Sequence, residues 1–297
     1  MVINLHIDII IVNYNSTDYS IQCIGSIYSS FQNIDSNIIV VDNASKDQPA
    51  RIKRAYPDVD LILNDQNIGF SKAVNIGLRC AESQWVIILN SDTIIFSGFL
   101  DYVVPFLNSN QEVAIVGPRI LENDGTIQGS ARRFPTVLTS LFGRKSPLTK
   151  MFPNNPVTKK EFLCFNGNGN KPIEVDWVSG ACMIARTKAL NDINGFDERF
   201  FMYWEDADLC SRLKNAGWKI IYYPLYKVYH HTGKSSNTVP LFSIFHFHRS
   251  CYIYFKKHAK WPLSILNPIS LMGLSLRCLL VMGLYGFQQL VNKNKRQ

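Results

Sequence analysis

The feature that most constrains the fold is a series of short, β-branched, apolar runs in the first half of the chain. Helical patterns, such as the one over residues 71–81, separate them. Strands that alternate with helices pair as βαβ units, so the sequence predicts an α/β fold with a mixed, mostly parallel sheet flanked by helices. The expected strands cover residues 7–12, 38–41, 60–63, 85–89 and 113–116.

Asparagine and aspartate gather where these runs end. The first, second and fourth runs end in NYN (13–15), DN (42–43) and NSD (90–92). In open α/β sheets, ligands bind in the crevice beyond the carboxyl ends of the strands. These polar side chains are therefore candidates for a ligand site at one edge of the sheet.

Composition indicates a globular protein and narrows its partners. Of 297 residues, 46% are hydrophobic and 18% are charged, and the net charge is +8. The sequence has no helix-turn-helix, zinc-finger or RNA-binding motif, so this charge does not predict nucleic-acid binding. The 7 cysteines form no C-x-x-C pair, which favours reduced thiols in the cytoplasm over a disulfide framework. The N-terminus lacks the basic region of a signal peptide.

The second half of the chain begins with a loop-rich insertion over residues 126–172, which contains five prolines. Long loops of this kind are usually functional or mobile, so we expect the insertion to cover a donor or to receive an acceptor. After it we expect a strand-like run over 175–185 that is interrupted at 179–180, a helix over 205–216, and strands over 219–223 and 226–230.

The last part of the chain is almost uniformly apolar from residue 261 to residue 291, with Arg277 as its one charge. The run is long enough to span a bilayer, but Pro268 interrupts it and an arginine near its middle is costly in hydrocarbon. We therefore expect one or two helices that lie on a membrane surface, and a buried helix in a homodimer contact is the alternative. The flanking basic residues, which suit anionic lipid, are Lys256, Lys257, Lys260, Lys293, Lys295 and Arg296.

Two carboxylates at strand ends are candidates for donor binding. Asp42 suits the imide N–H of uracil or thymine, or ribose hydroxyls; alternatively, it bonds its own backbone in a turn. Asp92 suits Mg²⁺ or Mn²⁺, which in turn binds a diphosphate; alternatively, it caps a helix. Considered alone, each residue is better explained by its structural role, a turn for Asp42 and a helix cap for Asp92.

The second half of the chain supplies the remaining candidates. Glu205 and Asp206 begin the expected helix, either as a general base near an acceptor hydroxyl or as partners of the helix dipole. Trp204 suits stacking on a sugar ring, although it equally suits the core. His230 ends the last expected strand and is either a metal ligand or a half-buried histidine. Arg132 lies in the insertion and either contacts phosphate or is solvated.

The order of these pieces carries more information than any one of them. The motifs, in order, are DIIIVNYNS, IIVVDNASKD, NIGFSKAVNIGL, WVIILNSD, VDWVSGACMIAR, GFDERFFMYWEDADLCSRLKNAGW and VYHHTGKSS. Together they resemble the inverting family-two glycosyltransferases, which have the GT-A fold, and most closely the bacterial rhamnosyltransferase-like branch. The resemblance covers nearly the whole chain. It implies a GT-A catalytic domain over 1–250, with a nucleotide-binding half (1–125) and an acceptor half (126–250), and a membrane-associating helical segment over 251–297.

The resemblance also implies a role for each candidate. Asp206 would act as the base, with Glu205 as its partner in the catalytic pair. Asp92 would hold Mn²⁺ or Mg²⁺, and His230 would be a ligand of this metal or of the diphosphate. Residues of the nucleotide pocket would be Asn13, Asn15, Asp42, Asn67, Lys72 and Ser91. Apart from the resemblance, we expect the acceptor or the donor sugar to meet Arg132, Trp177, Gly180 and Trp204.

One motif departs from the family pattern. The family's metal motif is often Asp-x-Asp, whereas Asn90 stands here in the first position and Asp92 in the third. An amide oxygen is a weaker ligand than a carboxylate. We therefore expect weak metal binding in the absence of nucleotide.

The expected activity is the inverting transfer of a sugar, with rhamnose as the leading candidate, from a nucleotide diphosphate sugar to a saccharide or lipid-linked saccharide acceptor. The expected setting is bacterial surface polysaccharide synthesis, by a cytoplasmic protein peripheral on the inner face of the cell membrane. One alternative is a sugar nucleotidyltransferase, although residues 13–16 replace the Gly-rich basic loop that such an enzyme normally carries. The other is a non-catalytic, membrane-associated nucleotide-sugar-binding or scaffold protein.

Overall fold

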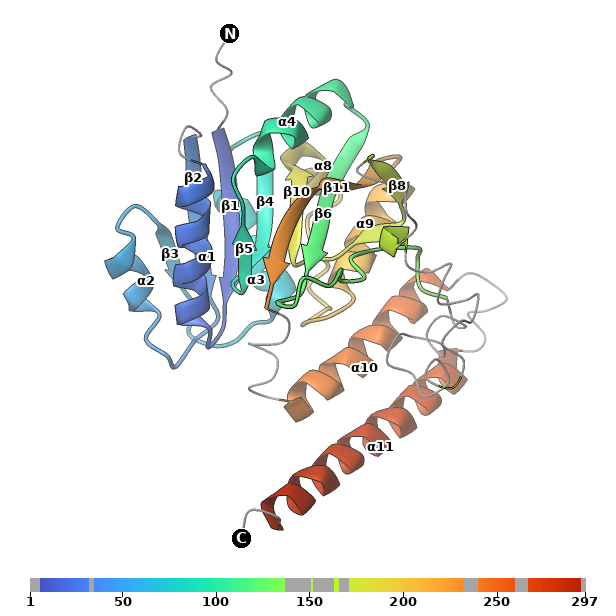
Figure 1. The fold of residues 1–297 in the computed structure, drawn as a ribbon. Coiled ribbons are helices and arrows are strands. Elements are labelled where there is room, and N and C mark those ends of the chain that lie inside the picture. The colour runs from blue at the N-terminus through green and yellow to red at the C-terminus, as the bar shows by residue number, and fades with distance from the viewer. Residues whose placement is uncertain are drawn as a thin grey trace.

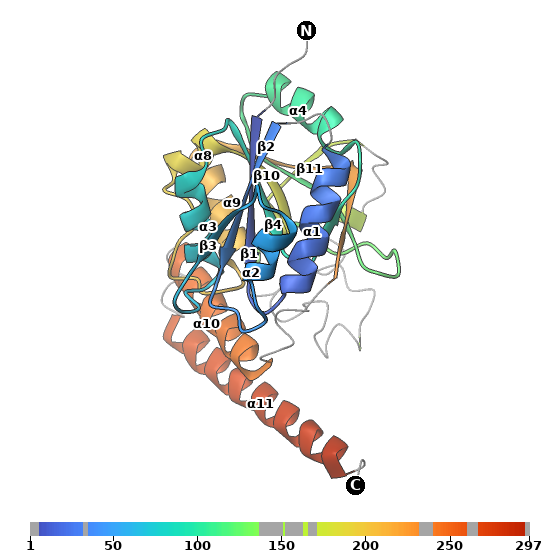
Figure 2. The same cartoon turned by 90° about the vertical axis from the view of Figure 1, so that its left-hand side faces the viewer.

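A computed structural model describes residues 6–31, 35–136, 151, 163–165, 171–231, 240–259 and 267–294. The described residues form a nine-stranded sheet with helices on both faces and two long helices beyond one edge (Figures 1 and 2). The strand order is β3-β2-β1-β4-β10-β6-β11-β5, and β8 also pairs with β11. This arrangement confirms the expected α/β class.

Most strands of the sheet run in one direction. The strands that share this direction are β1 (His6–Asn13), β2 (Asp35–Asp42), β3 (Asp60–Leu63), β4 (Trp85–Asn90), β6 (Val113–Leu121) and β11 (Lys219–His230). The antiparallel strands are β5 (Thr93–Ile95), β8 (Ile173–Val175) and β10 (Cys182–Arg186). Because β10 pairs with both β4 and β6, the carboxyl ends of β1, β2, β4, β6 and β11 meet at the lower edge in Figure 1.

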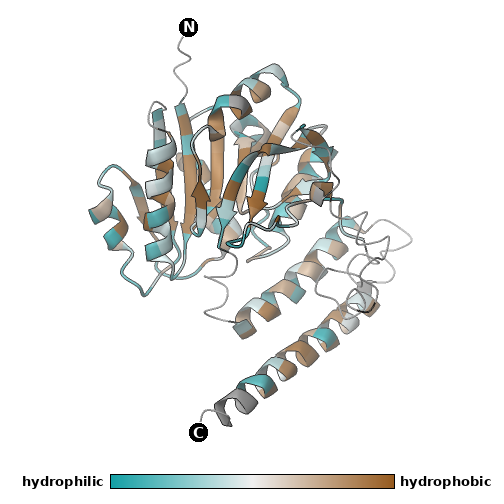
Figure 3. Cartoon of the chain, in the orientation of Figure 1, coloured by the Kyte–Doolittle hydropathy of each residue, from teal (hydrophilic) through white to brown (hydrophobic). Residues whose placement is uncertain are grey.

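Each face of the sheet has its own hydrophobic core. On one face lie α1 (Thr17–Ser30), α2 (Ala50–Ala55) and α4 (Phe99–Ser109); on the other lie α3 (Phe70–Cys80), α8 (Thr187–Asp192) and α9 (Glu205–Asn215). Ile9 and Ile11 of β1 belong to the first core and Ile10 to the second. A central strand covered on both faces needs apolar side chains at every position, which explains the unbroken apolar runs of the sequence (Figure 3).

The structure confirms the five expected strands of the first half and the expected interruption at 179–180, and it corrects one expectation for the second half. Residues 219–223 and 226–230 form one strand, β11, and not two. Pro224 lacks an N–H group, but the chain stays extended and pairing with β6 resumes after a register shift between Tyr223 and Lys227. The run over 175–185 comprises the last residue of β8, then β9 (Trp177–Val178), and after the break most of β10. β9 pairs with β7 (Ala131–Arg132) in a separate two-stranded sheet. Within the expected insertion over 126–172, the structure describes β7 and a short 3₁₀ helix, Leu163–Phe165.

The expected helical segment over 251–297 did not include the start of α10 (Pro240–His258), nor its position: α10 packs against the second core below the carboxyl edge of the sheet. Its last turn is joined to α9 by Asp208, which is fully buried. The Asp208 Oδ1 atom lies 2.7 Å from Lys257 Nζ and 2.8 Å from His258 Nε2. Lys257 Nζ also lies 2.6 Å from Asp197 Oδ2, so this lysine is engaged within the protein and is not a free basic flank for lipid.

The expected domain boundary at residue 250 falls inside α10. Since α10 shares buried contacts with α9, we propose that the catalytic unit extends through residue 259. The membrane-associating segment would then begin after that point.

The final helix, α11 (Asn267–Asn294), lies alongside α10 in both views (Figures 1 and 2). Within the described residues, its stretch Pro268–Gln289 is long and apolar enough to cross a membrane by length and composition, and little of it is buried. Its apolar side chains are between 59% and 69% exposed along one face, at positions three or four residues apart. We call this face, formed by Ile269, Met272, Leu276, Leu280, Leu284 and Phe287, the outer apolar face.

Candidate active site

The ends of β1 and β2 form a buried hydrogen-bond network around Asn13. Its Nδ2 atom donates to Asp42 Oδ2 at 2.7 Å and to Ser45 Oγ at 3.1 Å. Its Oδ1 atom accepts from the hydroxyl groups of Ser16 and Ser20 at 2.9 and 2.7 Å. The Ser45 N–H group also donates to Asp42 Oδ1 at 2.9 Å, as the turn alternative expects. Asn13 and Asp42 are thus held in fixed positions at the sheet edge.

Asn15 and Ser91 border this network. Asn15 has a left-handed φ of 50°, and its Oδ1 atom accepts from the N–H group of Lys46 at 2.8 Å. The hydroxyl of Ser91 lies 2.8 Å from the hydroxyl of Ser16. Ser91 therefore connects the end of β4 to the network at the end of β1.

Asn67 and Lys72 lie at the start of α3. Asn67 Oδ1 accepts from the N–H group of Gly69 at 3.0 Å, whereas the Lys72 side chain is exposed. The Phe70 N–H group donates to the carbonyl of Phe201 at 2.6 Å, which ties the start of α3 to the segment that precedes α9. The described contacts do not join Asn67 or Lys72 directly to the network around Asn13.

The pairing of β5 with β11 brings Asp92 to His230. Thr93 pairs with His230 in this ladder, and the His231 N–H group donates to the Asp92 carbonyl at 2.9 Å. As a result, Asp92 Oδ1 lies 3.2 Å from His230 Nε2, and Asn90 Nδ2 lies 3.2 Å from the same nitrogen.

A carboxylate oxygen and a bare imidazole nitrogen this close are two acceptors that need a proton or a cation between them. Carboxylate, amide and imidazole groups are ligand types that divalent metals accept, so the residues fit a metal but offer an incomplete shell. In the part of the chain that the structure describes, no three His, Cys, Asp or Glu side chains come together as a metal site.

Asp206 lies at the same edge, beside the turn that leads into β10. Its Oδ2 atom accepts from the Gly180 N–H group at 3.1 Å, and its Oδ1 atom accepts from the Ala207 N–H group at 2.8 Å. Burial raises the pKa of Asp206, while those N–H groups and the charge of Arg132 favour the ionised form. Arg132 pairs with Trp177 across β7 and β9, and its guanidinium carbon lies 4.9 Å from the Trp177 ring centroid.

Glu205 differs from its neighbour in its hydrogen bonding. Its Oε2 atom is buried without a hydrogen-bond partner within the described residues. Burial, with the adjacent Asp206 charge, raises the pKa of Glu205 to about 8. The two environments favour a protonated Glu205 beside an ionised Asp206, because only the latter accepts hydrogen bonds from the backbone at both oxygens.

Backbone strain immediately precedes this pair. Tyr203 and Trp204 have φ values of 66° and 67°, in the left-handed region that costs non-glycine residues about 1–3 kcal/mol each. Such strain persists where surrounding contacts impose it, and it gathers at functional sites. The Trp204 ring lies 5.3 Å from the ring of Tyr254 and 5.7 Å from that of Phe255, both in α10. This packing matches the core alternative for Trp204, and its stacking on a sugar stays a prediction.

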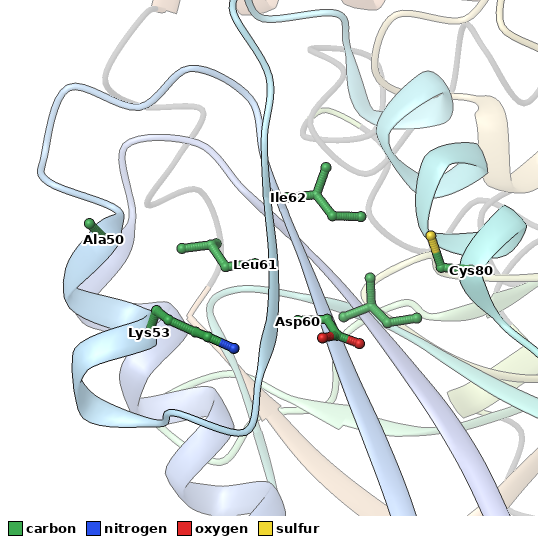
Figure 4. A pocket seen from close by; sticks show the side chains of 7 residues that line it. Ala50, Lys53, Asp60, Leu61, Ile62 and Cys80 are labelled. Carbon is green, nitrogen blue, oxygen red and sulfur yellow. The ribbon is translucent and has the colours of Figure 1, made fainter.

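A surface hollow lies away from these residues (Figure 4). It is bounded by α2, by β3 and by the end of α3. Asp60 in its wall is the first residue of β3, so the hollow lies toward the opposite edge of the sheet from the strand ends described above. It contains none of the expected site residues.

Comparison with known proteins identifies the family. The profile described as "Glycosyltransferase like family 2" matches residues 6–261. The chain belongs to this family. Its enzyme class, glycosyltransferase, follows from that membership.

Two relatives of the glycosyltransferase have named activities. An N-acetylglucosaminyl-diphospho-decaprenol L-rhamnosyltransferase of Mycobacterium tuberculosis is 32% identical over 240 residues, which cover 76% of each chain. The rhamnosyltransferase WbbL of Escherichia coli is 25% identical over 75% of this chain and 82% of its own. These matches confirm the resemblance to the rhamnosyltransferase-like branch.

Solved structures confirm the fold. A mannosyltransferase from Pyrobaculum calidifontis, in complex with GDP-Man and Mn²⁺, superposes with a TM-score of 0.55 at 17% identity, over 93% of this chain and 74% of its own. TarS of S. aureus in complex with UDP gives a TM-score of 0.53 at 16% identity, over 90% of this chain and 70% of its own. The expected GT-A class, with an appended apolar helix, is therefore confirmed.

The structure adds residues that the sequence analysis did not single out. Ser45 joins Asn13 and Asp42, and Gln128 lies against His230, with its Oε1 atom 3.1 Å from Nδ1. Gln128 lies beyond the end of β6, where the chain turns back and its N–H group donates to the Ile120 carbonyl, so the pattern of polar residues directly after strands does not mark it. It was missed because it lies in a segment assigned only as loop. For the expected site residues, the structure gives positions and contacts, and their roles stay predictions.

The buried carboxyl of Glu205 predicts a pH-dependent stability difference. A carboxyl pKa that is raised from about 4.3 in the unfolded chain to about 8 in the native state means that the native state binds the proton more tightly. The stability from this group is fully present below the unfolded pKa and is lost as pH rises through the folded pKa. We expect Glu205→Gln to gain stability over wild type between about pH 5 and pH 8, by at most about 1.4 kcal/mol per pH unit.

Urea unfolding at a series of pH values measures this difference. Glu82→Gln, which changes an exposed glutamate, is the matched control and should show little dependence on pH. A Glu205→Gln difference that stays constant over this range would mean that the native pKa of Glu205 is not raised.

Proposed function

We propose that this glycosyltransferase transfers a sugar from a nucleoside diphosphate sugar to a saccharide or lipid-linked saccharide, with inversion at the anomeric carbon. Rhamnose from thymidine diphosphate rhamnose is the leading donor, and bacterial surface polysaccharide synthesis is the setting. The relationship to rhamnosyltransferases, one of which is named for a diphospho-decaprenol acceptor, supports this choice. The observation that carries the chemistry is the Asp206 carboxylate, held by two backbone N–H groups at the sheet edge.

Asp206 is the proposed general base. In a direct displacement, the acceptor oxygen forms a bond to the anomeric carbon while the bond from that carbon to the diphosphate oxygen breaks. The acceptor proton passes to Asp206, and the sugar passes through an oxocarbenium-like state. The Gly180 and Ala207 N–H groups fix the direction in which the carboxylate faces. Burial raises the pKa of Asp206 and so makes it a stronger base than an exposed aspartate.

The neighbouring groups orient the reactants. A protonated Glu205 is a hydrogen-bond donor, and its Oε2 atom has no partner among the described residues. It therefore suits a bond to an oxygen of the donor sugar or of the acceptor substrate. Arg132, stacked on Trp177 near Asp206, suits a phosphate of the donor or of a lipid-linked acceptor. The network of Asn13 and Asp42 suits the nucleoside.

Asp92 and His230 are the proposed holders of Mn²⁺ or Mg²⁺. When bound there, the cation would neutralise charge that develops on the leaving diphosphate. Among the residues that the structure describes, one carboxylate and one imidazole meet here, which are too few ligands for tight binding alone. Oxygen atoms of the donor diphosphate would complete the shell, so metal and nucleotide should bind together.

We further propose that the protein is cytoplasmic and lies on the inner face of the cell membrane through α11. Packing of α11 along α10 leaves the outer apolar face exposed, with the exposed Arg277 at its border. An apolar helix face next to a folded domain suits insertion into the boundary between lipid headgroups and acyl chains. A homodimer contact through the same face is the alternative.

Asp206→Asn should lower kcat for sugar transfer by about a hundred- to ten-thousand-fold while nucleotide affinity stays near wild type. Asparagine keeps an oxygen for the Gly180 N–H group but accepts no proton from the acceptor. Steady-state kinetics with thymidine diphosphate rhamnose, together with calorimetric titration of thymidine diphosphate, measure the two effects. Glu205→Gln is the control and should act mainly through KM for the acceptor. An active Asp206→Asn enzyme with an inactive Glu205→Gln enzyme would make Glu205 the base. If both variants were active, neither residue would be the base.

Thermal unfolding should show that thymidine diphosphate stabilises the protein clearly with Mn²⁺ and only weakly with EDTA. Bound ligand at 100 times Kd adds about 2.7 kcal/mol to the stability of the native state. Asp92→Asn should remove the effect of Mn²⁺, whereas Asp65→Asn, which changes an exposed aspartate, should leave it unchanged. Equal Tm shifts in Mn²⁺ and EDTA would contradict the metal role of Asp92.

Full-length protein should pellet with vesicles of phosphatidylcholine and phosphatidylglycerol. A protein that ends at residue 259 should stay soluble and folded, because α10 and its contacts with Asp208 are kept. Replacing Leu276, Leu280 and Leu284 with glutamine should also abolish pelleting without changing Tm, since these side chains are exposed. A full-length protein that remains in the supernatant as a dimer, and becomes monomeric with the three glutamines, would favour the dimer alternative.

A further inference from the structure

Gln128 holds His230 at two points. Its Nε2 atom donates to the backbone carbonyl of His230 at 3.2 Å, and its Oε1 atom lies 3.1 Å from His230 Nδ1. The backbone of Gln128 is itself fixed, since its N–H group donates to the Ile120 carbonyl at 2.8 Å and its carbonyl accepts from Ser130 N–H at 2.8 Å. Gln128 is therefore a rigid partner for both the main chain and the ring of His230.

This double contact determines which ring nitrogen carries the proton. A backbone carbonyl only accepts hydrogen bonds, so the amide nitrogen of Gln128 must face the carbonyl of His230. The amide oxygen of Gln128 is then left facing Nδ1, and it also only accepts. Nδ1 must therefore be the nitrogen that bears hydrogen in the neutral ring.

The other ring nitrogen faces the opposite chemistry. Nε2 lies 3.2 Å from Asp92 Oδ1 and 3.2 Å from Asn90 Nδ2. With the proton on Nδ1, the Nε2 lone pair accepts from the Asn90 amide and points toward the carboxylate. Without Gln128, the carboxylate of Asp92 would attract the proton to Nε2, and that nitrogen could no longer bind a metal.

We propose that Gln128 is a positioning residue that keeps the His230 proton on Nδ1 and so reserves the Nε2 lone pair for a divalent cation shared with Asp92. This inference rests on the proposed metal role of Asp92 and His230. A hydrogen-bond partner on the second nitrogen of a metal-binding histidine fixes its tautomer and orientation, and loss of such a partner typically lowers metal affinity about 10- to 100-fold.

The test uses the full-length protein in detergent and two measurements. Nitrogen NMR of protein labelled at histidine nitrogen reports the tautomer of His230, whose signals are assigned by their loss in His230→Asn. Mn²⁺ titration in the presence of thymidine diphosphate, followed by electron paramagnetic resonance, reports affinity. Neither measurement depends on turnover.

Gln128→Leu should move the His230 proton to Nε2 and weaken Mn²⁺ binding about 10- to 100-fold. Gln128→Glu keeps an oxygen that accepts from Nδ1, so it should retain the wild-type tautomer and recover most of the affinity even though it loses the bond to the backbone carbonyl. Gln111→Leu changes an exposed glutamine whose side chain donates to the Asn108 carbonyl, and it should match wild type in both measurements.

The outcomes separate this inference from the proposed function. Wild-type protein that binds Mn²⁺, with Gln128→Leu unchanged in tautomer and affinity, would overturn the positioning role and leave the metal role intact. If Mn²⁺ binding were equally weakened in Gln128→Leu and Gln128→Glu with no change of tautomer, Gln128 would act through packing alone. That result would also overturn the positioning role. Wild-type protein that binds no Mn²⁺ with nucleotide would overturn the metal role itself, and this inference with it.

Discussion

The antiparallel pairing of β10 between β4 and β6 is the interaction on which the arrangement of the molecule depends. It joins the parallel strands β3-β2-β1-β4 to the pair β6 and β11 in one sheet. All five residues of β10 are buried, and Arg186 at its end lies over the Trp85 ring and donates to the Leu107 carbonyl at 3.1 Å. Because β10 runs backward, the turn before it, with Gly180, lies at the carboxyl ends of its neighbours. That turn supplies the N–H group that orients Asp206.

Two adjacent carboxyl groups at the start of α9 have different environments, and this difference separates their chemistry. Asp206 accepts from two backbone N–H groups and lies near the Arg132 charge, whereas the buried Oε2 atom of Glu205 has no partner among the described residues. Burial raises the pKa of both groups, so ionising both carboxyl groups at once is costly. A protonated donor beside an ionised acceptor suits a reaction in which one group orients an oxygen and the other removes its proton.

The helix that carries this pair is also tied to the C-terminal part of the chain. Asp208 lies one turn of α9 after Glu205 and is joined to Arg212 in its own helix and to Lys257 and His258 in α10. With α11 packed along α10, the exposed apolar surface is held at the edge of the sheet where the strand ends meet (Figure 1). In the proposed setting, the base and the membrane surface would thus have a fixed relative position, which suits an acceptor anchored in lipid.

The sequence alone determined the class of the fold, the family and the polar residues at the strand ends. These follow from local pattern: apolar runs of strand length require burial on both faces, and the motifs are long enough to identify the family. Tertiary structure decided which of these residues meet. The three-residue strand β5 is too short to predict from its own sequence, yet its pairing with β11 brings Asp92 within 3.2 Å of His230, 138 positions further along the chain. Gln128 and the attachment of α10 to α9 were missed for the same physical reason, because both depend on contacts between distant segments and not on local periodicity.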